Sequence, residues 1–238
     1  SSPNNFLWHS GLTRLFFVAD DGVHGRELWQ RSGGVETRVT DISVGLDDSS
    51  PTGLGALSAS LVFTADDGGS GTRLFGYDGA SVSQLKSLST AGAPNRPRYT
   101  LPWNGRVYFN EGSSCWQTDG TTVGTITFES YCSSSLAFAI GDGRLLYSKS
   151  VSGESEIWSI DSADVKTQET DLSTYSSSPS GFTWLGATAF FSADDAVSGR
   201  ELWVSDGTPE GTELIDLNSG PGASSPAQFT LFEDEIWF

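Results

Sequence analysis

The sequence repeats itself at a nearly fixed interval. The tetrapeptide RELW at residues 26–29 returns unchanged at residues 200–203. An aromatic residue recurs at the same place in five successive segments, in steps of 46, 41, 42 and 45 residues. These residues are Trp29, Phe75, Trp116, Trp158 and Trp203. A repeat of this length constrains the fold strongly, because each copy must be one structural unit that buries its apolar faces by stacking on its neighbours.

Each repeat contains four short apolar segments. In the fifth repeat they cover about residues 182–185, 188–193, 201–204 and 212–217. The segments are rich in aromatic and branched residues and are bounded by Gly, Asp, Ser or Pro, which is the pattern of β-strands. No window shows a sustained period of 3.6 residues, so we expect almost no helix.

Four antiparallel strands in about 40–45 residues are typical of one blade of a β-propeller. We therefore predict an all-β chain, a β-propeller of four-stranded antiparallel blades with five full repeats and a partial sixth. We expect a single propeller over residues 1–238. Its approximate repeats are 1–48, 49–92, 93–133, 134–175, 176–222 and the partial repeat 223–238. Because the chain contains no methionine, we expect a fragment or a processed form of a longer chain.

The charge balance limits the partners. The formal net charge is −17, and such a surface repels nucleic acid and anionic membranes. No apolar run approaches the roughly 18 residues that a membrane-spanning helix needs. We expect a chain that neither binds nucleic acid nor spans a membrane. A saline or extracellular setting and simple solubility are two interpretations of the acidity that both stay open.

The two cysteines, Cys115 and Cys132, both fall in the third repeat. Cys115 lies at the start of the third predicted strand and Cys132 at the end of the fourth, so an antiparallel hairpin brings them within a bulge or one pleat of being opposite. We predict a disulfide, which fits an oxidising compartment and requires Cα atoms within about 7 Å of each other. Two buried free thiols are the alternative.

Adjacent aspartates recur in the loop between the second and third predicted strands. They are Asp20 and Asp21, Asp66 and Asp67, and Asp194 and Asp195. Neighbouring carboxylates are unfavourable unless they are solvated, paired or bound to a cation, and Ca²⁺ prefers several oxygens from a flexible loop. Calcium sites are one interpretation, although the loops lack the spacing of an EF-hand. Solvated hairpins with Arg26 or Arg200 as the local counter-charge are the other.

Residues 201–212, with the sequence ELWVSDGTPEGT, identify a resemblance. The segment resembles the ELWxxDGT repeat, a family found in large secreted or surface proteins of bacteria. The fifth repeat matches throughout, the first has RSGG at residues 31–34 in place of the Asp-Gly-Thr turn, and the fourth is the most divergent. The resemblance covers nearly the whole chain. It implies a β-propeller-like secreted or cell-surface bacterial protein and no defined reaction.

Tryptophans fall into two groups. Those on the third predicted strands are expected to pack between blades as core residues. Trp8, Trp103 and Trp184 lie on the predicted first strands, nearer the central channel, and are our candidates for stacking on a ligand. The recurring Asp-Gly pairs between the third and fourth strands are expected to form turns, in which Asp accepts backbone N–H groups and Gly takes a positive φ.

Support for catalysis is weak. The chain has two histidines, His9 and His24, and neither falls in a nucleophile or metal motif. Carboxylates are plentiful, so a glycosidase pair, which is defined by its separation in space, stays open. We predict a non-catalytic extracellular β-propeller module for adhesion, assembly or ligand recognition, with Ca²⁺ as a candidate cofactor. The expected partner is a protein or a surface glycan, and a role as a subunit of a larger assembly is compatible with this prediction. The alternatives are a carbohydrate-binding lectin and a polysaccharide-acting glycoside hydrolase or lyase.

Overall fold

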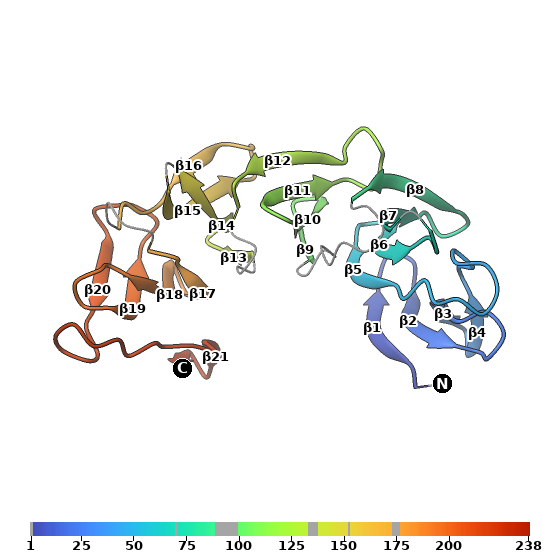
Figure 1. Cartoon of the computed structure of the whole chain (residues 1–238), viewed down its shortest axis with the longest axis horizontal. Helices are drawn as coiled ribbons and strands as arrows, with labels where there is room; N and C mark the ends of the chain where they lie inside the picture. The colour runs from blue at the N-terminus through green and yellow to red at the C-terminus, as the bar shows by residue number, and fades with distance from the viewer. Residues whose placement is uncertain (1, 70, 89–99, 133–137, 152, 173–176) are drawn as a thin grey trace. The chain divides into compact units, whose positions relative to one another are not determined.

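The computed structural model describes residues 2–69, 71–88, 100–132, 138–151, 153–172 and 177–238. All regular elements among these residues are β-strands. They form five antiparallel sheets of four strands and one sheet of two strands (Figure 1). The prediction of an all-β chain with five four-stranded repeats and a partial sixth is confirmed. Within the described part of the chain there is no helix that is long and apolar enough to cross a membrane.

The chain divides into two compact units, Ser1–Phe128 and Glu129–Phe238. Three sheets, which we call blades 1, 2 and 3, begin in the first unit. Blade 1 consists of β1 (Asn4–His9), β2 (Arg14–Asp20), β3 (Arg26–Ser32) and β4 (Val35–Arg38). Blade 2 consists of β5 (Thr52–Ala56), β6 (Leu61–Asp66), β7 (Thr72–Tyr77) and β8 (Val82–Ser87). Blade 3 consists of β9 (Thr100–Trp103), β10 (Arg106–Glu111), β11 (Ser114–Thr118) and β12 (Ile126–Ser130).

The second unit contains blades 4 and 5 and a two-stranded hairpin. Blade 4 consists of β13 (Ala139–Gly141), β14 (Arg144–Val151), β15 (Glu154–Asp161) and β16 (Lys166–Gln168). Blade 5 consists of β17 (Ser180–Leu185), β18 (Thr188–Asp194), β19 (Arg200–Ser205) and β20 (Thr212–Ile215). The hairpin consists of β21 (Thr230–Phe232) and β22 (Glu235–Trp237).

Strands follow one another in sequence order across every sheet, so each blade is an antiparallel meander. The first strands of successive blades contact each other within each unit: β1 contacts β5 and β5 contacts β9, while β13 contacts β17 and β17 contacts β21. The first strand of a blade therefore forms its inner edge (Figure 1).

An aromatic pair spans the second and third strands of every blade. The cross-strand partners are Phe17 and Trp29, Phe63 and Phe75, Phe109 and Trp116, Tyr147 and Trp158, and Phe191 and Trp203. Directly opposed side chains stabilise a sheet by their mutual packing. The rings of Phe63 and Phe75 are stacked with centroids 5.6 Å apart, and those of Phe191 and Trp203 lie 6.5 Å apart.

In blades 2, 3 and 5 the aromatic pair faces the blade that precedes it. Phe75 packs in one cluster with Phe16 of blade 1, Trp116 packs against Val62 of blade 2, and Trp203 packs with Leu146 of blade 4. We call this side of a blade its backward face and the opposite side its forward face. The prediction that third-strand tryptophans pack between blades is confirmed for Trp116 and Trp203.

Candidate functional site

The acidic doublets form hydrogen-bonded turns. In the first loop, Asp21 Oδ1 accepts the N–H groups of Val23 and His24, both at 2.9 Å. In the fifth blade, Asp195 Oδ1 accepts the N–H groups of Val197 and Ser198 at 2.9 and 2.7 Å. The first aspartate of each doublet accepts the N–H group two residues on. These bonds are the local turn chemistry that Asp favours.

Hydrogen bonding favours the ionised form of Asp21 and Asp195. The His24 side chain, together with the N–H group of Val23, lowers the pKa of Asp21 to about 2. Burial tends to raise the pKa of Asp195, but the N–H groups of Ser198 and Val197 hold that pKa below its usual value. In the second loop, Asp67 Oδ2 lies 3.1 Å from Arg73 Nε. Within the described residues, no three His, Cys, Asp or Glu side chains are grouped as a metal site requires, so calcium binding at these loops stays a prediction.

A buried glutamate, which sequence reasoning missed, organises three of the blades. It is the Glu of the repeated Glu-Leu-Trp segment, which reads Glu-Ile-Trp in blade 4. Glu27 and Glu201 are fully buried and Glu156 is 4% exposed. Glu27 Oε2 accepts the hydroxyl of Thr40 at 2.6 Å and the N–H group of Ile42 at 3.3 Å. The sequence did contain a signal for this role, since a charged residue recurs within an apolar strand. A charge buried in such a strand needs fixed hydrogen-bond partners.

The same arrangement returns in blades 4 and 5. Glu156 Oε2 accepts the hydroxyl of Thr170 at 2.6 Å. Glu201 accepts the N–H groups of Leu217 at 2.9 Å and Ser224 at 2.7 Å. In each case the carboxylate holds the segment that follows the fourth strand and leads to the next blade. This glutamate is therefore a structural clamp with its oxygens already engaged.

The Asp-Gly-Thr turns close by a repeated set of hydrogen bonds. Asp206 Oδ1 accepts the N–H group of Thr208 at 2.9 Å and its hydroxyl at 2.7 Å, and Thr208 Oγ1 accepts the N–H group of Gly211 at 3.0 Å. Asp119 and Thr121 make the matching bonds in blade 3. The bonds from Thr208 lower the pKa of Asp206. The turn prediction for these Asp-Gly pairs is confirmed.

One such turn contacts an ion pair of the preceding blade. Arg144 Nη1 lies 3.0 Å from Glu169 Oε1, and Glu169 is 1% exposed. Gly207 has a φ of +90°, and a Cβ at this position would clash with the guanidinium of Arg144 and the carboxylate of Glu169. Glycine adopts this backbone conformation without strain and leaves room for the ends of both side chains.

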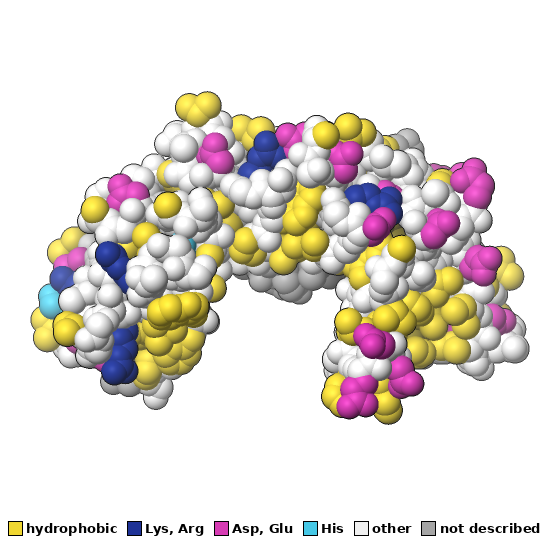
Figure 2. Space-filling view, turned by 180° about the vertical axis from the view of Figure 1, so that it is seen from behind, with side chains coloured by type: hydrophobic (Ala, Val, Ile, Leu, Met, Phe, Trp, Pro, Cys, Tyr) yellow, Lys and Arg dark blue, Asp and Glu magenta, His cyan; other side chains and the backbone are white. Residues whose placement is uncertain are grey.

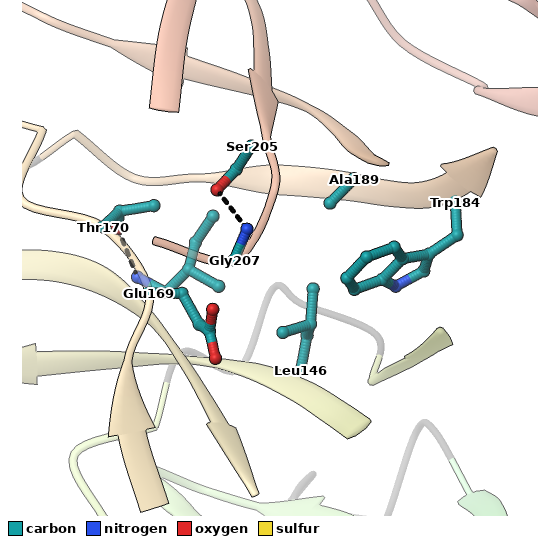
Figure 3. A pocket seen from close by; sticks show the side chains of 8 residues that line it. Leu146, Glu169, Thr170, Trp184, Ala189, Ser205 and Gly207 are labelled. Atoms are coloured by element: carbon teal, nitrogen blue, oxygen red, sulfur yellow. Dashed lines mark hydrogen bonds between the residues drawn. The ribbon is translucent and has the colours of Figure 1, made fainter. Parts of the chain in front are cut away.

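Figure 3 shows the cavity beside this contact. It measures about 10 Å³ and is lined by Leu146, Ile157, Thr170, Trp184 and other residues of blades 4 and 5. That volume holds roughly one water molecule. The cavity is therefore a packing gap between two blades and is too small for an organic ligand.

The three candidate ligand-binding tryptophans have different surroundings. Trp184 packs with the core cluster between blades 4 and 5, and the Arg144 guanidinium lies 5.9 Å from its ring centroid. Trp103 is half-buried, with its ring 5.9 Å from that of Tyr108. Trp8 is 61% exposed. The packing role of Trp184 leaves Trp8 as the most accessible of the three.

The cysteines are oxidised in the structure. Both Cys115 and Cys132 are disulfide-bonded, and neither is a free thiol. Their side chains are buried, with 2% and 4% exposure. A persistent disulfide is typical of proteins in oxidising compartments.

Two adjoining hollows lie between the inner strands β1 and β5. One measures about 170 Å³ and is lined by Asn4, Asn5, Val18, Arg26, Ser50, Pro51 and Thr52. The other measures about 190 Å³ and is lined by Asn5, Phe6, Leu7, Gly53 and Leu54. The side chain of Asn5 stands between them and donates to the Pro51 carbonyl at 3.2 Å. We call this pair of hollows the β1–β5 cleft.

The cleft combines amide groups with an exposed ring. Among the residues that the structure describes, Arg26 is the one charged residue that lines it, and its Nη2 donates to Asn4 Oδ1 at 2.8 Å. The ring of Phe6 is 60% exposed and stacks on Phe17 with its other side, at 6.0 Å between centroids. Each hollow is smaller than the roughly 300–1,000 Å³ of a drug-sized pocket. The cleft suits a small polar ligand with one apolar face.

Both histidines are held in place by hydrogen bonds to nearby groups. His9 is 1% exposed, its Nε2 lies 2.8 Å from the Ser60 carbonyl, and its Nδ1 accepts the Leu12 N–H group at 3.1 Å. This pattern places the proton on Nε2. His24 Nδ1 bonds to Asp21 Oδ2 at 2.8 Å. The partners of His9 are backbone groups, and the partner of His24 is the carboxylate of its own loop.

Comparisons with known proteins identify the fold and leave the family open. No protein-family model matches the sequence, and a search of curated proteins found no match. Virginiamycin B lyase from Staphylococcus aureus is similar in structure, with a TM-score of 0.50 and 15% identity over 94% of this chain and 72% of that one. TolB from Acinetobacter baumannii has a TM-score of 0.45 and 14% identity over 92% of this chain.

The β-propeller domain of the Trilobed protease from Pyrococcus furiosus has a TM-score of 0.44 and 14% identity, over 70% of this chain and 54% of that one. The chain spans 55% of the length of the TolB structure. At these identities the likeness shows the fold alone, which together with the stacked four-stranded sheets is that of a β-propeller.

Proposed function

We propose that this chain is a non-catalytic β-propeller module of a secreted or cell-surface bacterial protein, acting in adhesion, assembly or ligand recognition. One observation carries the proposal. The recurring polar groups, namely the buried glutamates and the turn aspartates, have their oxygens engaged in holding loops and turns. Groups that already serve as hydrogen-bond acceptors for the scaffold are poorly placed to act as acids, bases or nucleophiles.

Three further features support the extracellular setting. The cysteines are disulfide-bonded, the net charge of −17 suits a medium in which salt screens repulsion, and residues 201–212 resemble the ELWxxDGT repeat of secreted and surface proteins. The partner is a protein or a surface glycan.

The proposal is tested by offering the chain to a panel of bacterial and host polysaccharides. We expect saturable binding to a surface component without release of reducing ends or unsaturated products. Turnover that a single carboxylate substitution abolishes would establish a glycoside hydrolase or lyase instead.

The β1–β5 cleft favours a second candidate function, that of a lectin. Its amide groups can bond to sugar hydroxyls, and the exposed face of Phe6 can cover the apolar face of a pyranose ring. Binding to a glycan array, followed by calorimetry on the best ligand, tests this function.

The matched variants for the lectin test are glycine substitutions at two positions with similar backbone angles. Asn5 has a φ of 52° and lines the cleft, whereas Asn104 has a φ of 48° and lies outside it. We expect Asn5→Gly to weaken glycan binding at least about tenfold, which corresponds to about 1.4 kcal/mol. Asn104→Gly should leave binding unchanged. Equal effects of the two substitutions would remove the cleft as the site.

A further inference from the structure

Blades 1 and 5 carry an arginine at the same place, the first residue of the third strand. The two residues are Arg26 and Arg200. In blade 5 the guanidinium is bound by its own blade. Arg200 Nη1 donates to Ser180 Oγ and Ser192 Oγ, both at 3.2 Å. Arg200 Nη2 donates to the Ser178 carbonyl at 2.8 Å.

Blade 1 lacks the matching acceptors. The pair of Asn4 and Val18 has the same place in the register as the pair of Ser180 and Ser192 in blade 5. A valine side chain accepts no hydrogen bond. Among the described residues, the guanidinium of Arg26 makes one hydrogen bond, from Nη2 to Asn4 Oδ1 at 2.8 Å. Its other N–H groups are therefore available to a ligand.

This arginine lines the hollow of about 170 Å³ in the β1–β5 cleft. The walls are the forward face of blade 1 and the segment that leads into blade 2, and both belong to the first compact unit. Asn5, Ser50 and Thr52 add polar groups, and Val18 adds an apolar wall. Asn5 Nδ2 donates to the Pro51 carbonyl at 3.2 Å, which leaves Asn5 Oδ1 to accept a hydroxyl group of a ligand.

Charge around the hollow favours a ligand with a single negative charge. None of the ion pairs among the described residues includes Arg26. Asp20 and Asp48 lie near this arginine without lining the hollow. Asp20 Oδ1 accepts the Gly22 N–H group at 2.6 Å, and Asp48 Oδ1 accepts the Arg26 N–H group at 2.7 Å. Repulsion from these two acids makes a doubly charged oxyanion less favourable than a carboxylate.

The rest of the surface does not attract anions. On the face shown in Figure 2, Lys and Arg side chains form small separate groups rather than one basic surface. The net charge of −17 also opposes the capture of an anion at long range. At an ionic strength of about 0.15 M the Debye length is about 8 Å, so distant acids are screened. A ligand inside the hollow still meets the guanidinium directly.

We propose that Arg26 binds the carboxylate of an acidic sugar, such as a uronic acid unit, in this hollow. The planar guanidinium matches the two oxygens of a carboxylate, and the sugar hydroxyls bond to Asn5 and Thr52. The hollow is smaller than a drug-sized pocket, so it suits a single sugar unit. This inference rests on the lectin candidate and deepens it, since it names the class of sugar.

The test is a titration of the full 238-residue chain with galacturonate, galactose and acetate, followed by NMR chemical shifts at neutral pH and constant ionic strength. Galactose has the ring without the carboxylate, and acetate has the carboxylate without the ring. We expect galacturonate to bind at least about tenfold more tightly than either. Equal binding of galacturonate and galactose would overturn the role of the guanidinium. Equal binding of galacturonate and acetate would overturn the sugar.

Two substitutions in blade 1 test the arginine. Arg26→Gln should weaken galacturonate binding at least about tenfold, the scale of a charge-assisted hydrogen bond. Val18→Thr keeps the arginine but offers it a hydroxyl acceptor, as Ser192 does in blade 5, and should weaken binding about threefold. Thr64 occupies this position in blade 2 and is buried, so a threonine fits there. Arg200→Gln is the matched control and should leave binding unchanged.

The outcomes separate this inference from the lectin function. An Arg26→Gln chain that is folded and binds galacturonate like the wild type would overturn the inference. Binding of neutral glycans that Asn5→Gly weakens and Arg26→Gln does not would keep the lectin function and overturn the acidic sugar. A wild-type chain that binds neither galacturonate nor any glycan of an array would overturn both.

Discussion

At the scale of single residues, the glutamate of the Glu-Leu-Trp segment has a central structural role. Glu27 is fully buried and accepts hydrogen bonds from Thr40, Ile42 and Ser43. A buried carboxylate is tolerated only when such partners compensate its lost hydration. The residue thus joins the third strand of a blade to the segment that leads into the next blade.

Glu27→Gln should lower the free energy of unfolding by about 1–3 kcal/mol, because the amide nitrogen would point a donor at the Thr40 and backbone donors. Urea denaturation measures this change. Glu36→Gln is the matched control, since Glu36 lies exposed on β4 and should change the same free energy by less than about 0.5 kcal/mol. Equal effects of the two substitutions would show that the hydrogen bonds of Glu27 make no specific contribution to the free energy of unfolding.

Glu201 gives the same clamp a pH dependence. Burial tends to raise its pKa, but the bonds from Ser224 and Leu217 outweigh burial and leave the pKa below its usual value. A carboxyl with a depressed pKa in the folded state contributes stability above its unfolded pKa, about 4.3, and this contribution is lost as pH falls through the folded value. The difference in unfolding free energy between wild type and Glu201→Gln should therefore shrink below about pH 4. A difference that grows on acidification would contradict this assignment.

A substitution at Gly207 tests the contact between its turn and the neighbouring blade. Gly207→Ala should destabilise the chain through both its positive φ of +90° and the clash with Arg144 and Glu169. Gly153 has a φ of +94° and nothing near the position of an added Cβ, so Gly153→Ala should lose only the backbone term of about 1–2 kcal/mol. The difference between the thermal unfolding midpoints of the two variants measures the contribution of packing at Gly207. Equal midpoints would show that packing against Arg144 and Glu169 contributes nothing.

At the scale of elements, the loops between second and third strands are the chief candidates for metal binding. Each carboxylate pair already accepts N–H groups of its own loop. These bonds fix the turn without a cation, so the solvated-hairpin interpretation predicts equal thermal unfolding midpoints in calcium and in excess chelator at equal ionic strength. The calcium interpretation predicts a rise of several degrees that Asp194→Asn and Asp195→Asn remove, since a ligand bound only to the folded state must raise the midpoint.

Breaks in the register of the inner strands shape the β1–β5 cleft. Positive φ angles at Asn5, Gly53 and Gly181 coincide with breaks in the register of β1, β5 and β17. Bulges of this kind bend a strand and redirect side chains. In β1 the break turns Asn5 into the β1–β5 cleft.

At the scale of the whole molecule, the acidic surface dominates. With a net charge of −17 and an isoelectric point near 4.2, the folded chain repels itself at neutral pH. Raising the salt concentration from about 10 to 500 mM at pH 7 should therefore raise the thermal unfolding midpoint, because the Debye length shortens. The same titration near pH 4.2 is the control and should give little change. A midpoint that falls with salt at pH 7 would mean that attractive ion pairs outweigh the repulsion.

The repeat, the strands and their grouping into blades can all be read from the sequence. These features are local: strand patterns, turn residues and the repeat of about 40–45 residues can be read from neighbouring positions. The Asp-Gly-Thr turns belong to the same class, because Asp206 bonds to groups within the next few residues.

The long-range partners of these residues could not be predicted from the sequence and are seen in the three-dimensional structure. The contact of Arg144 with the turn at Asp206 joins residues 62 positions apart, and Trp184 packs between blades whereas its equivalent Trp8 is exposed. A repeat gives both tryptophans the same place on a strand, but burial depends on whether another blade covers that face. The sequence pattern contains the strand and its two faces, and the stacking of blades selects which of those faces is core and which is surface.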